Sequence, residues 1–169
     1  MPSFGITDFY ASAQRQEFAR KFQFKIQTLG PLTEEDLIYF TTTTLPGKTI
    51  SNQTVPYMGV TFNVPGTVSY EGSSGWNVTF RCDEASNIRS KLLAWQTEIF
   101  DVNTSSGKYG VPIEAAVVQQ LGKDLKPLRT FRLIGIYPTK VGDLSYDVTN
   151  NGEPQTFEVT FAYQYWEEI

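Results

Sequence analysis

The chain of 169 residues contains no histidine. Histidine is the commonest general base and metal ligand, so its absence removes every Ser-His-Asp and Cys-His arrangement. Cys82 is the only cysteine, which excludes an intrachain disulfide and a cysteine-based zinc site. Carboxylates do cluster at Glu34–Asp36 and at Asp143 with Asp147, but no recognisable frame opposes them across a cleft, as glycoside hydrolysis requires. We therefore expect no enzyme, no cofactor and no metal site.

Positive charge is also scarce, since 14 lysines and arginines face 18 acidic residues and the net charge is −4. This balance argues against tight binding of a phosphate backbone, although nucleic acid could still pass along an acidic wall that repels it. No apolar run approaches the ~20 residues of a membrane-spanning helix. The first residues lack the basic and apolar stretches of a secretory signal, so we expect folding in a cytosol.

Apolar residues make up 40% of the chain and aromatic residues 14%, which is typical of a globular protein. About eight segments read as strands, several from alternating apolar and polar positions and one, at 37–44, from its β-branched and aromatic residues. The sequence therefore predicts a mainly β fold, a sandwich or partly closed barrel with one flanking helix. We expect a single domain over residues 1–169, with an N-terminal arm at residues 1–21.

One helix is predicted strongly, after a strand that ends near Cys82. Asp83 is placed to cap this helix, and Glu84 suits its first turn. Its apolar residues recur at helical spacing and should pack in the core: Ile88, Leu92, Trp95 and Ile99.

The end of the chain reads as a short strand that breaks at 150–152, followed by a long alternating strand. Side chains alternate across a strand, so this strand has two different faces. The core face should carry Phe157, Val159, Phe161, Tyr163 and Tyr165. The wetted face should carry Thr156, Glu158, Thr160, Ala162 and Gln164.

Residues 48–70 predict a hairpin that projects from the domain. Two extended segments, 49–57 and 60–64, flank the turn at Met58-Gly59. A lone two-stranded ribbon cannot form a core, so we expect it to dock on something else. The contact residues that we predict are Thr49, Ile50, Val55, Tyr57 and Met58. Several margin strands also lack blunting prolines or charges, and such edges invite pairing with another chain.

Several of these segments match one known family in order and approximate spacing. They are Thr44-Leu-Pro-Gly47, Asn63-Val-Pro-Gly66, Trp76-Asn-Val-Thr-Phe80, Tyr137-Pro-Thr-Lys-Val-Gly142 and Gln155-Thr-Phe-Glu-Val-Thr-Phe161 through Tyr165-Trp166. The chain resembles the tail tube subunit of contractile-tailed, T-even-like bacteriophages, which is related to the tubes of type VI secretion systems. The resemblance covers most of the chain beyond the arm.

The resemblance implies a structural virion protein of the phage tail. Subunits of that family form six-fold rings whose strands join into an inner barrel. The rings stack into a hollow tube through which DNA is ejected, inside a contractile sheath. It further implies that sheath protein, tape-measure protein and a baseplate initiator are partners, with assembly in the host cytoplasm and no membrane contact. On this view the hairpin docks on an adjacent subunit or ring, and Thr156, Glu158, Thr160 and Gln164 line the lumen, past which DNA moves without specific binding.

Two alternatives stay open from the sequence. A baseplate subunit that initiates the tube shares this fold, although such proteins usually carry extra domains. A non-phage β-sandwich module that binds sugar or protein ligands would instead stay monomeric and carry an exposed aromatic platform. The size of the protein in solution would separate these readings.

Overall fold

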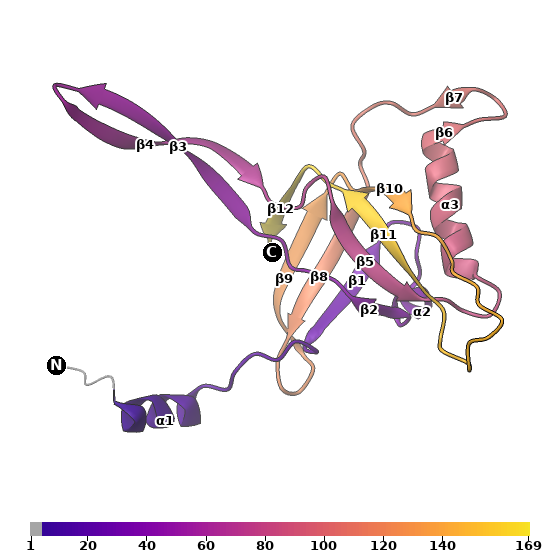
Figure 1. The fold of residues 1–169 in the computed structure, drawn as a ribbon, viewed down its shortest axis with the longest axis horizontal. Helices are drawn as coiled ribbons and strands as arrows, with labels where there is room; N and C mark the ends of the chain where they lie inside the picture. The colour runs from indigo at the N-terminus through magenta and orange to yellow at the C-terminus, as the bar shows by residue number, and fades with distance from the viewer. Residues whose placement is uncertain (1–4) are drawn as a thin grey trace.

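A computed structural model describes residues 5–169, and within them the chain is mainly β (Figure 1). Two antiparallel four-stranded sheets form the body, in the orders β1-β8-β9-β12 and β10-β11-β5-β2. The first comprises β1 Phe24–Leu29, β8 Ala115–Leu121, β9 Pro127–Ile134 and β12 Tyr165–Glu168. The second comprises β10 Tyr137–Val141, β11 Thr156–Ala162, β5 Trp76–Arg81 and β2 Phe40–Thr42.

Two pairs of strands and three helices complete the described chain. The strand pairs are β3 Lys48–Tyr57 with β4 Val60–Tyr70, and β6 Phe100–Asp101 with β7 Ser106–Gly107. The helices are α1 Ile6–Arg15, α2 Glu34–Leu37 and α3 Asn87–Ile99. The mainly β prediction is confirmed, and eight of the described strands have five or more residues: β1, β3, β4, β5, β8, β9, β10 and β11.

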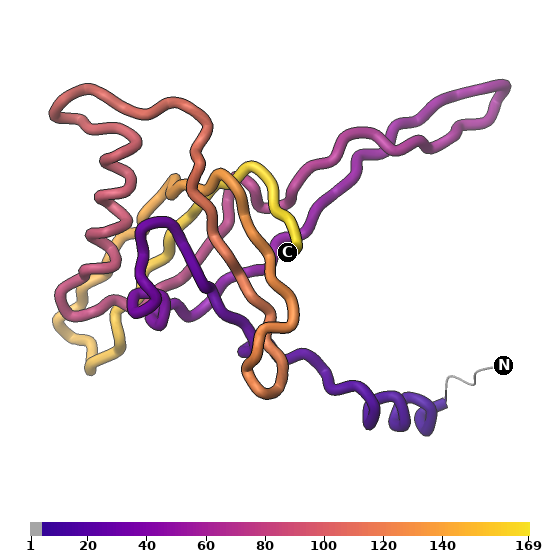
Figure 2. The backbone as a smooth tube through the Cα atoms, turned by 180° about the vertical axis from the view of Figure 1, so that it is seen from behind, coloured from indigo at the N-terminus to yellow at the C-terminus, as the bar shows by residue number. Residues whose placement is uncertain are grey.

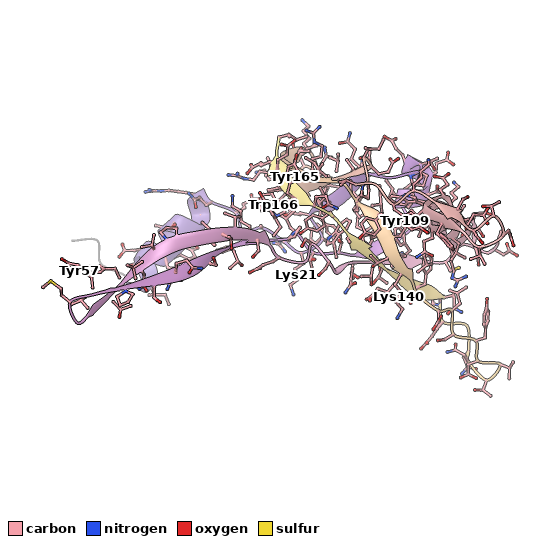
Figure 3. The ribbon with its side chains drawn as sticks, turned by 90° about the horizontal axis from the view of Figure 1, so that it is seen from above. Lys21, Tyr57, Tyr109, Lys140, Tyr165 and Trp166 are labelled. Atoms are coloured by element: carbon pink, nitrogen blue, oxygen red, sulfur yellow. The ribbon has the colours of Figure 1, made fainter. Side chains whose placement is uncertain are left out.

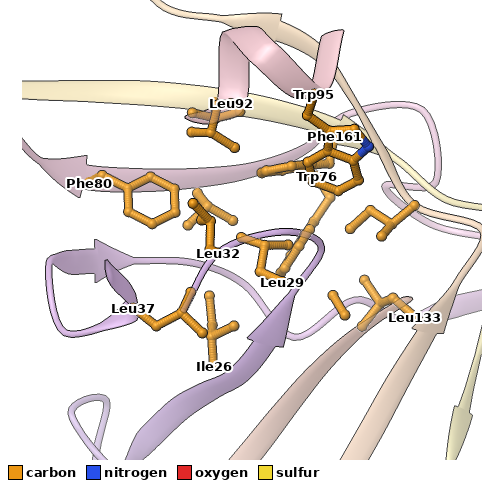
Figure 4. Close-up of a cluster of buried hydrophobic side chains, with 14 of the residues drawn as sticks. Ile26, Leu29, Leu32, Leu37, Trp76, Phe80, Leu92, Trp95, Leu133 and Phe161 are labelled. Carbon is orange, nitrogen blue, oxygen red and sulfur yellow. The ribbon is translucent and has the colours of Figure 1, made fainter. Parts of the chain in front are cut away.

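The core lies between the two sheets (Figure 4). Strands β5 and β11 pair in register and turn their aromatic residues inward. The rings of Phe80 and Phe157 stack at 5.7 Å, and those of Trp76 and Phe161 lie 5.7 Å apart. All four side chains are buried, as expected where every second residue of a strand is large and apolar.

Two stretches of chain pass from one sheet to the other. Strand β9 reaches β10 through Gly135, whose φ of +70° suits glycine, and a Cβ there would lie 2.5 Å from the side chain of Gln164. Strand β11 reaches β12 through a corner at Tyr163 and Gln164. The prediction of one unbroken C-terminal strand was therefore wrong. The corner shifts the alternation, so Tyr165 is 43% exposed and Trp166 instead packs on Phe131.

Helix α3 packs on the core beside β10. Its predicted apolar residues Ile88, Leu92 and Trp95 are buried, and Ile99 is partly buried against the core. The Trp95 ring lies 5.9 Å from that of Phe161 and covers Gly30, where a Cβ would approach it to 2.5 Å. This contact ties the helix to both sheets.

The start of α3 differs in detail from the prediction. Ser86, in the left-handed conformation with φ 54°, precedes the first helical residue, Asn87. Asp83 does accept a hydrogen bond from the backbone N–H of Asn87, at 3.1 Å. Glu84 lies before the helix and not in its first turn, because the chain makes a turn before the helix begins.

Of two predicted strands, the one at 37–44 is shortened to β2 Phe40–Thr42, and the other is replaced by irregular structure. Leu37 ends the short helix α2, because Thr33 and Asp36 cap that helix reciprocally and Lys91 contacts Asp36 at 2.5 Å. The strand expected before 150–152 is absent from the described residues, and the chain there is irregular. Asp147 accepts hydrogen bonds from Thr149 in that stretch and favours a turn over a strand.

The ribbon β3–β4 leaves the body at a point fixed by the C-terminal strand (Figure 2). The indole N–H of Trp166 donates to the carbonyl of Gly47 at 3.1 Å, and the hydroxyl of Tyr163 donates to the carbonyl of Glu71 at 2.6 Å. The ring of Tyr70 also meets that of Trp166 at 6.0 Å. These contacts hold both strands of the ribbon at its base.

The predicted arm is described from residue 5, and residues 1–4 of it lie outside the described part of the chain. Helix α1 stands away from the two sheets, beyond the end of β1 (Figures 1 and 2). None of its residues is buried.

Replacement of Trp95 by alanine should lower the free energy of unfolding by about 3–5 kcal/mol, because the change removes buried aromatic contacts and leaves a cavity. Urea unfolding measures this loss. Leu93 of the same helix is 38% exposed, and its alanine variant is the matched control. The control should lose less than about 1 kcal/mol. An equally small loss for Trp95→Ala would show that this helix face is not part of the core.

The anchor at Tyr163 makes stability sensitive to alkaline pH. Burial, and then the nearby Glu71 carboxylate, raise the pKa of Tyr163 from 10.0 to about 12. The phenol therefore contributes stability that is present below pH 10 and is lost as the pH rises towards 12. Tyr163→Phe cannot ionise, so its unfolding free energy should fall less than that of the unmodified protein across this interval. Urea unfolding at several pH values measures both free energies. An equal fall in the two proteins between pH 10 and 12 would contradict the assignment.

Candidate assembly surfaces

The distal half of the β3–β4 ribbon is amphipathic. Cross-strand partners share a face, and the pairs Tyr57↔Val60 and Val55↔Phe62 bring four large apolar residues together with Val64. All five are between 44% and 67% exposed. We call these residues the distal apolar face: Val55, Tyr57, Val60, Phe62 and Val64.

The opposite face of the same segment is polar. Asn52 donates from its side-chain amide to that of Asn63 at 3.1 Å, and Thr54 pairs across the ribbon with Asn63. The ribbon thus offers one apolar and one polar surface at its far end, where Figure 3 shows Tyr57 remote from the body.

A bulge in β4 changes this arrangement nearer the body. Between the pairs Ile50↔Val68 and Asn52↔Pro65, strand β4 has one residue more than β3. Gly66 fits there because a Cβ would lie 2.4 Å from the Ser51 hydroxyl. By alternation along β3, Ile50 and Val68 face the side opposite to the distal apolar face. The ribbon therefore exposes apolar side chains on both sides, at two different levels.

The sequence-predicted contact residues are all exposed on this ribbon. Thr49 lies at its base, where its hydroxyl donates to Glu71 at 2.5 Å. Met58 and Gly59 form the tip, both with positive φ, as a two-residue hairpin turn requires. Sequence reasoning missed Val60, Phe62 and Val64, although their alternation in β4 was a signal for an apolar face.

The outer face of the second sheet carries three of the four residues predicted to line the lumen. Thr156, Glu158 and Thr160 stand opposite Arg81, Thr79 and Asn77 of β5. Gln164 is separate, because it lies at the β11–β12 corner beside Gly135.

Threonines dominate this outer face, and their hydroxyls are used within it. Thr160 donates to the Asn77 side chain at 2.9 Å, and Thr139 donates to the backbone carbonyl of Thr160 at 3.0 Å. Thr41 donates to the carbonyl of Thr79 at 3.2 Å. Lys140 of β10 pairs with Thr160 of β11, and Arg81 of β5 pairs with Thr156, so the face has cations near Glu158 and is not uniformly acidic.

Each sheet also has unpaired strand edges within the described residues. In the first sheet β1 has a ladder only with β8, and β12 has one only with β9. In the second sheet β2 is one edge, and β10, the other, is flanked by α3. The first sheet thus presents two free edges on opposite sides, a condition for pairing with copies of itself.

Among residues 5–169, no group of three or more cysteine, aspartate and glutamate side chains is placed to bind a metal. Within the same range, no helix is long and apolar enough to cross a membrane. Cys82 is half-buried, with its sulfur 3.2 Å from the Ser86 hydroxyl. The outstanding features are exposed apolar surface and open strand edges, which suit association.

Comparison with solved structures places the fold among contractile injection systems. The tube-terminating cap of the anti-feeding prophage is similar with a TM-score of 0.64, at 15% identity over 91% of this chain and 92% of that one. A chain of the sheath-tube complex of an extracellular contractile injection system, PVC in its extended state, gives a TM-score of 0.58 at 17% identity over 99% of both chains.

Comparison of sequences gives the family. The chain is 32% identical over 167 residues to the tail tube protein gp19 of Enterobacteria phage T4, covering 96% of this chain and 99% of the relative. The tail tube protein gp19 of Enterobacteria phage T6 matches with the same identity and coverage. The profile of the phage tail tube protein family matches residues 12–169. These relatives are structural components of the virion and not enzymes, which favours a tube subunit over a ligand-binding module. The chain belongs to the phage tail tube protein family.

Proposed function

We propose that six copies of this chain close into a ring, and that rings stack into the hollow tube of a contractile tail. One observation carries the proposal: the ribbon exposes apolar side chains on both faces, and among residues 5–169 no other segment covers them. A cluster of exposed apolar side chains beside polar ones marks an interaction site. The family membership makes other copies of the same chain the natural partner.

Ring closure is expected to use the first sheet. Its free edges, β1 and β12, lie at opposite sides of the sheet. Pairing of β1 in one subunit with β12 in the next is a head-to-tail contact, and such contacts close a ring when the rotation permits. The first sheets of neighbouring subunits would then join into one continuous barrel, with the second sheet of each subunit on its inner side.

Stacking is assigned to the ribbon. Its distal apolar face and the Ile50–Val68 pair point to opposite sides, so one ribbon can contact two different subunits. The anchors from Tyr163 and Trp166 keep it aimed away from the body. A fixed direction lowers the ordering cost when the ribbon docks.

The lumen is assigned to the outer face of the second sheet, at Thr156, Glu158 and Thr160. The threonine and asparagine groups of this face bond to each other and to the backbone, which leaves fewer donors for phosphate. Such a surface suits passage of DNA without specific binding. Gln164, at the corner, is not included.

The remaining partners follow from the same role. A tube inside a contractile sheath needs contacts with sheath protein, and its length and start need a tape-measure protein and a baseplate initiator. The related PVC chain comes from a sheath-tube complex. Assembly would take place in the host cytoplasm.

The ribbon assignment is tested by two double variants with the same charge change. Val55→Asp with Phe62→Asp places two carboxylates in direct opposition on the distal apolar face, and Thr54→Asp with Asn63→Asp does so on the polar face. The first variant should raise the critical concentration for tube assembly by about 100-fold or more, because each buried side chain contributes ~1.5 kcal/mol or more and 1.4 kcal/mol is tenfold. Sedimentation and electron microscopy measure it.

The matched variant should assemble close to the normal concentration, and circular dichroism should show both proteins folded. Equal effects of the two variants would mean that charge on the ribbon, and not the apolar face, controls assembly. Normal stacking of the first variant would remove the ribbon from the proposal.

The lumen assignment is tested by Glu158→Lys. The variant should still assemble, because the side chain is exposed. Stacked rings would then repeat the introduced ammonium group beside Arg81 and Lys140, so tubes should retain DNA at low salt and release it at high salt. Glu84→Lys is the control with the same charge change at another position outside the core. If both variants retain DNA equally, or neither does, this face does not line the lumen.

A further inference from the structure

The N-terminal arm has an apolar stripe that the rest of the described chain leaves exposed. Ile6, Phe9 and Tyr10 recur on one side of α1 and are 84%, 64% and 66% exposed. The ring of Phe18 stacks on Phe9 at 6.1 Å and extends the stripe. An isolated helix of ten residues is marginal in water, so α1 needs a packing partner.

The arm is only loosely attached to its own body. Glu17 contacts Lys123 at 3.3 Å, but these two side chains are 68% and 75% exposed. An ion pair so exposed contributes little. The arm is therefore free to be placed by another surface.

A matching surface lies at the opposite end of the molecule. A groove of about 500 Å³ separates α3 from the extended segment that follows β7. Its apolar lining includes Trp95, Ile99, Tyr109, Val111, Ile113 and Tyr137. Tyr109, Val111 and Ile113 are 78%, 76% and 90% exposed, so no segment of the part that the structure describes covers this wall of the groove.

Charges around the two surfaces are complementary. The groove carries Glu98 and Glu114 against the single cation Lys108. The arm carries the cations Arg15, Arg20 and Lys21 against the carboxylates Asp8 and Glu17, so its balance is positive where that of the groove is negative. The ion pairs of the described residues include none of the three charged groove residues.

The arm and the groove of one subunit face away from each other. Figures 1 and 2 both place the body between α1 and α3. A donor at one end and an acceptor at the other make a head-to-tail contact between copies.

We propose that α1 of one subunit packs its Ile6, Phe9 and Tyr10 stripe into the groove between α3 and residues 109–114 of a neighbouring subunit. This inference rests on the proposed assembly into rings and tubes. It adds a second intersubunit contact to the one made by the sheet edges. The helix orders on docking, and the exposed wall of the groove is covered.

Cross-linking of assembled tubes tests the contact. In a Cys82→Ser background, Phe9→Cys with Ile113→Cys should be joined between copies by a short bismaleimide, and denaturing gels should show a ladder at multiples of 19.1 kDa. Ala13→Cys with Val111→Cys is a second pair, so that one unfavourable geometry does not decide the result. Each single-cysteine variant, and Phe9→Cys with Val148→Cys, should remain at the mass of one subunit.

The outcomes separate this inference from the proposed function. Tubes that form without either arm–groove cross-link would overturn the docking of α1 and leave the tube function standing. Cross-linking of Tyr57→Cys with Ile113→Cys, in place of the arm pairs, would show that the ribbon occupies the groove. A chain that stays monomeric at its highest soluble concentration would contradict both.

Discussion

The last stretch of the chain, from Thr156 to Glu168, holds the rest of the structure together. It crosses from the second sheet to the first at the Tyr163 corner, so one segment supplies core residues to both sheets. Phe161 meets the Trp95 ring of α3, and Trp166 hydrogen-bonds to the base of the ribbon. Because the ribbon has no core of its own, its direction depends on these anchors. Loss of this segment would therefore release the sheets, the helix and the ribbon together.

Much of this body could be predicted from periodicity. The alternation through Phe157, Val159 and Phe161 indicated the core face of β11, where a single register buries every large side chain. Periodicity failed where a local contact redirects the chain. The corner beside Gly135 moved Tyr165 to the surface, and the Thr33 cap turned the segment at Leu37 into a helix. Such contacts join residues distant in sequence or depend on one side-chain hydrogen bond, so no period reveals them.

The candidate surfaces were predictable only in part. A ribbon at 48–70 could be expected from its turn and its lack of core residues, but the bulge at Gly66 decides which side chains share a face. The groove could not be predicted, since it brings Trp95 beside Ile113 through packing of the whole body. Likewise, Arg81 and Lys140 join Glu158 only through strand pairing, which makes that face mixed in charge and not acidic.

Electron cryomicroscopy of the unmodified chain after concentration would show directly whether the ribbon holds the assembly together. We expect stacked six-fold rings in which the Val55–Phe62 side of each ribbon lies against another subunit. Tubes in which that side of the ribbon faces solvent, or particles that remain single subunits, would contradict this role of the ribbon.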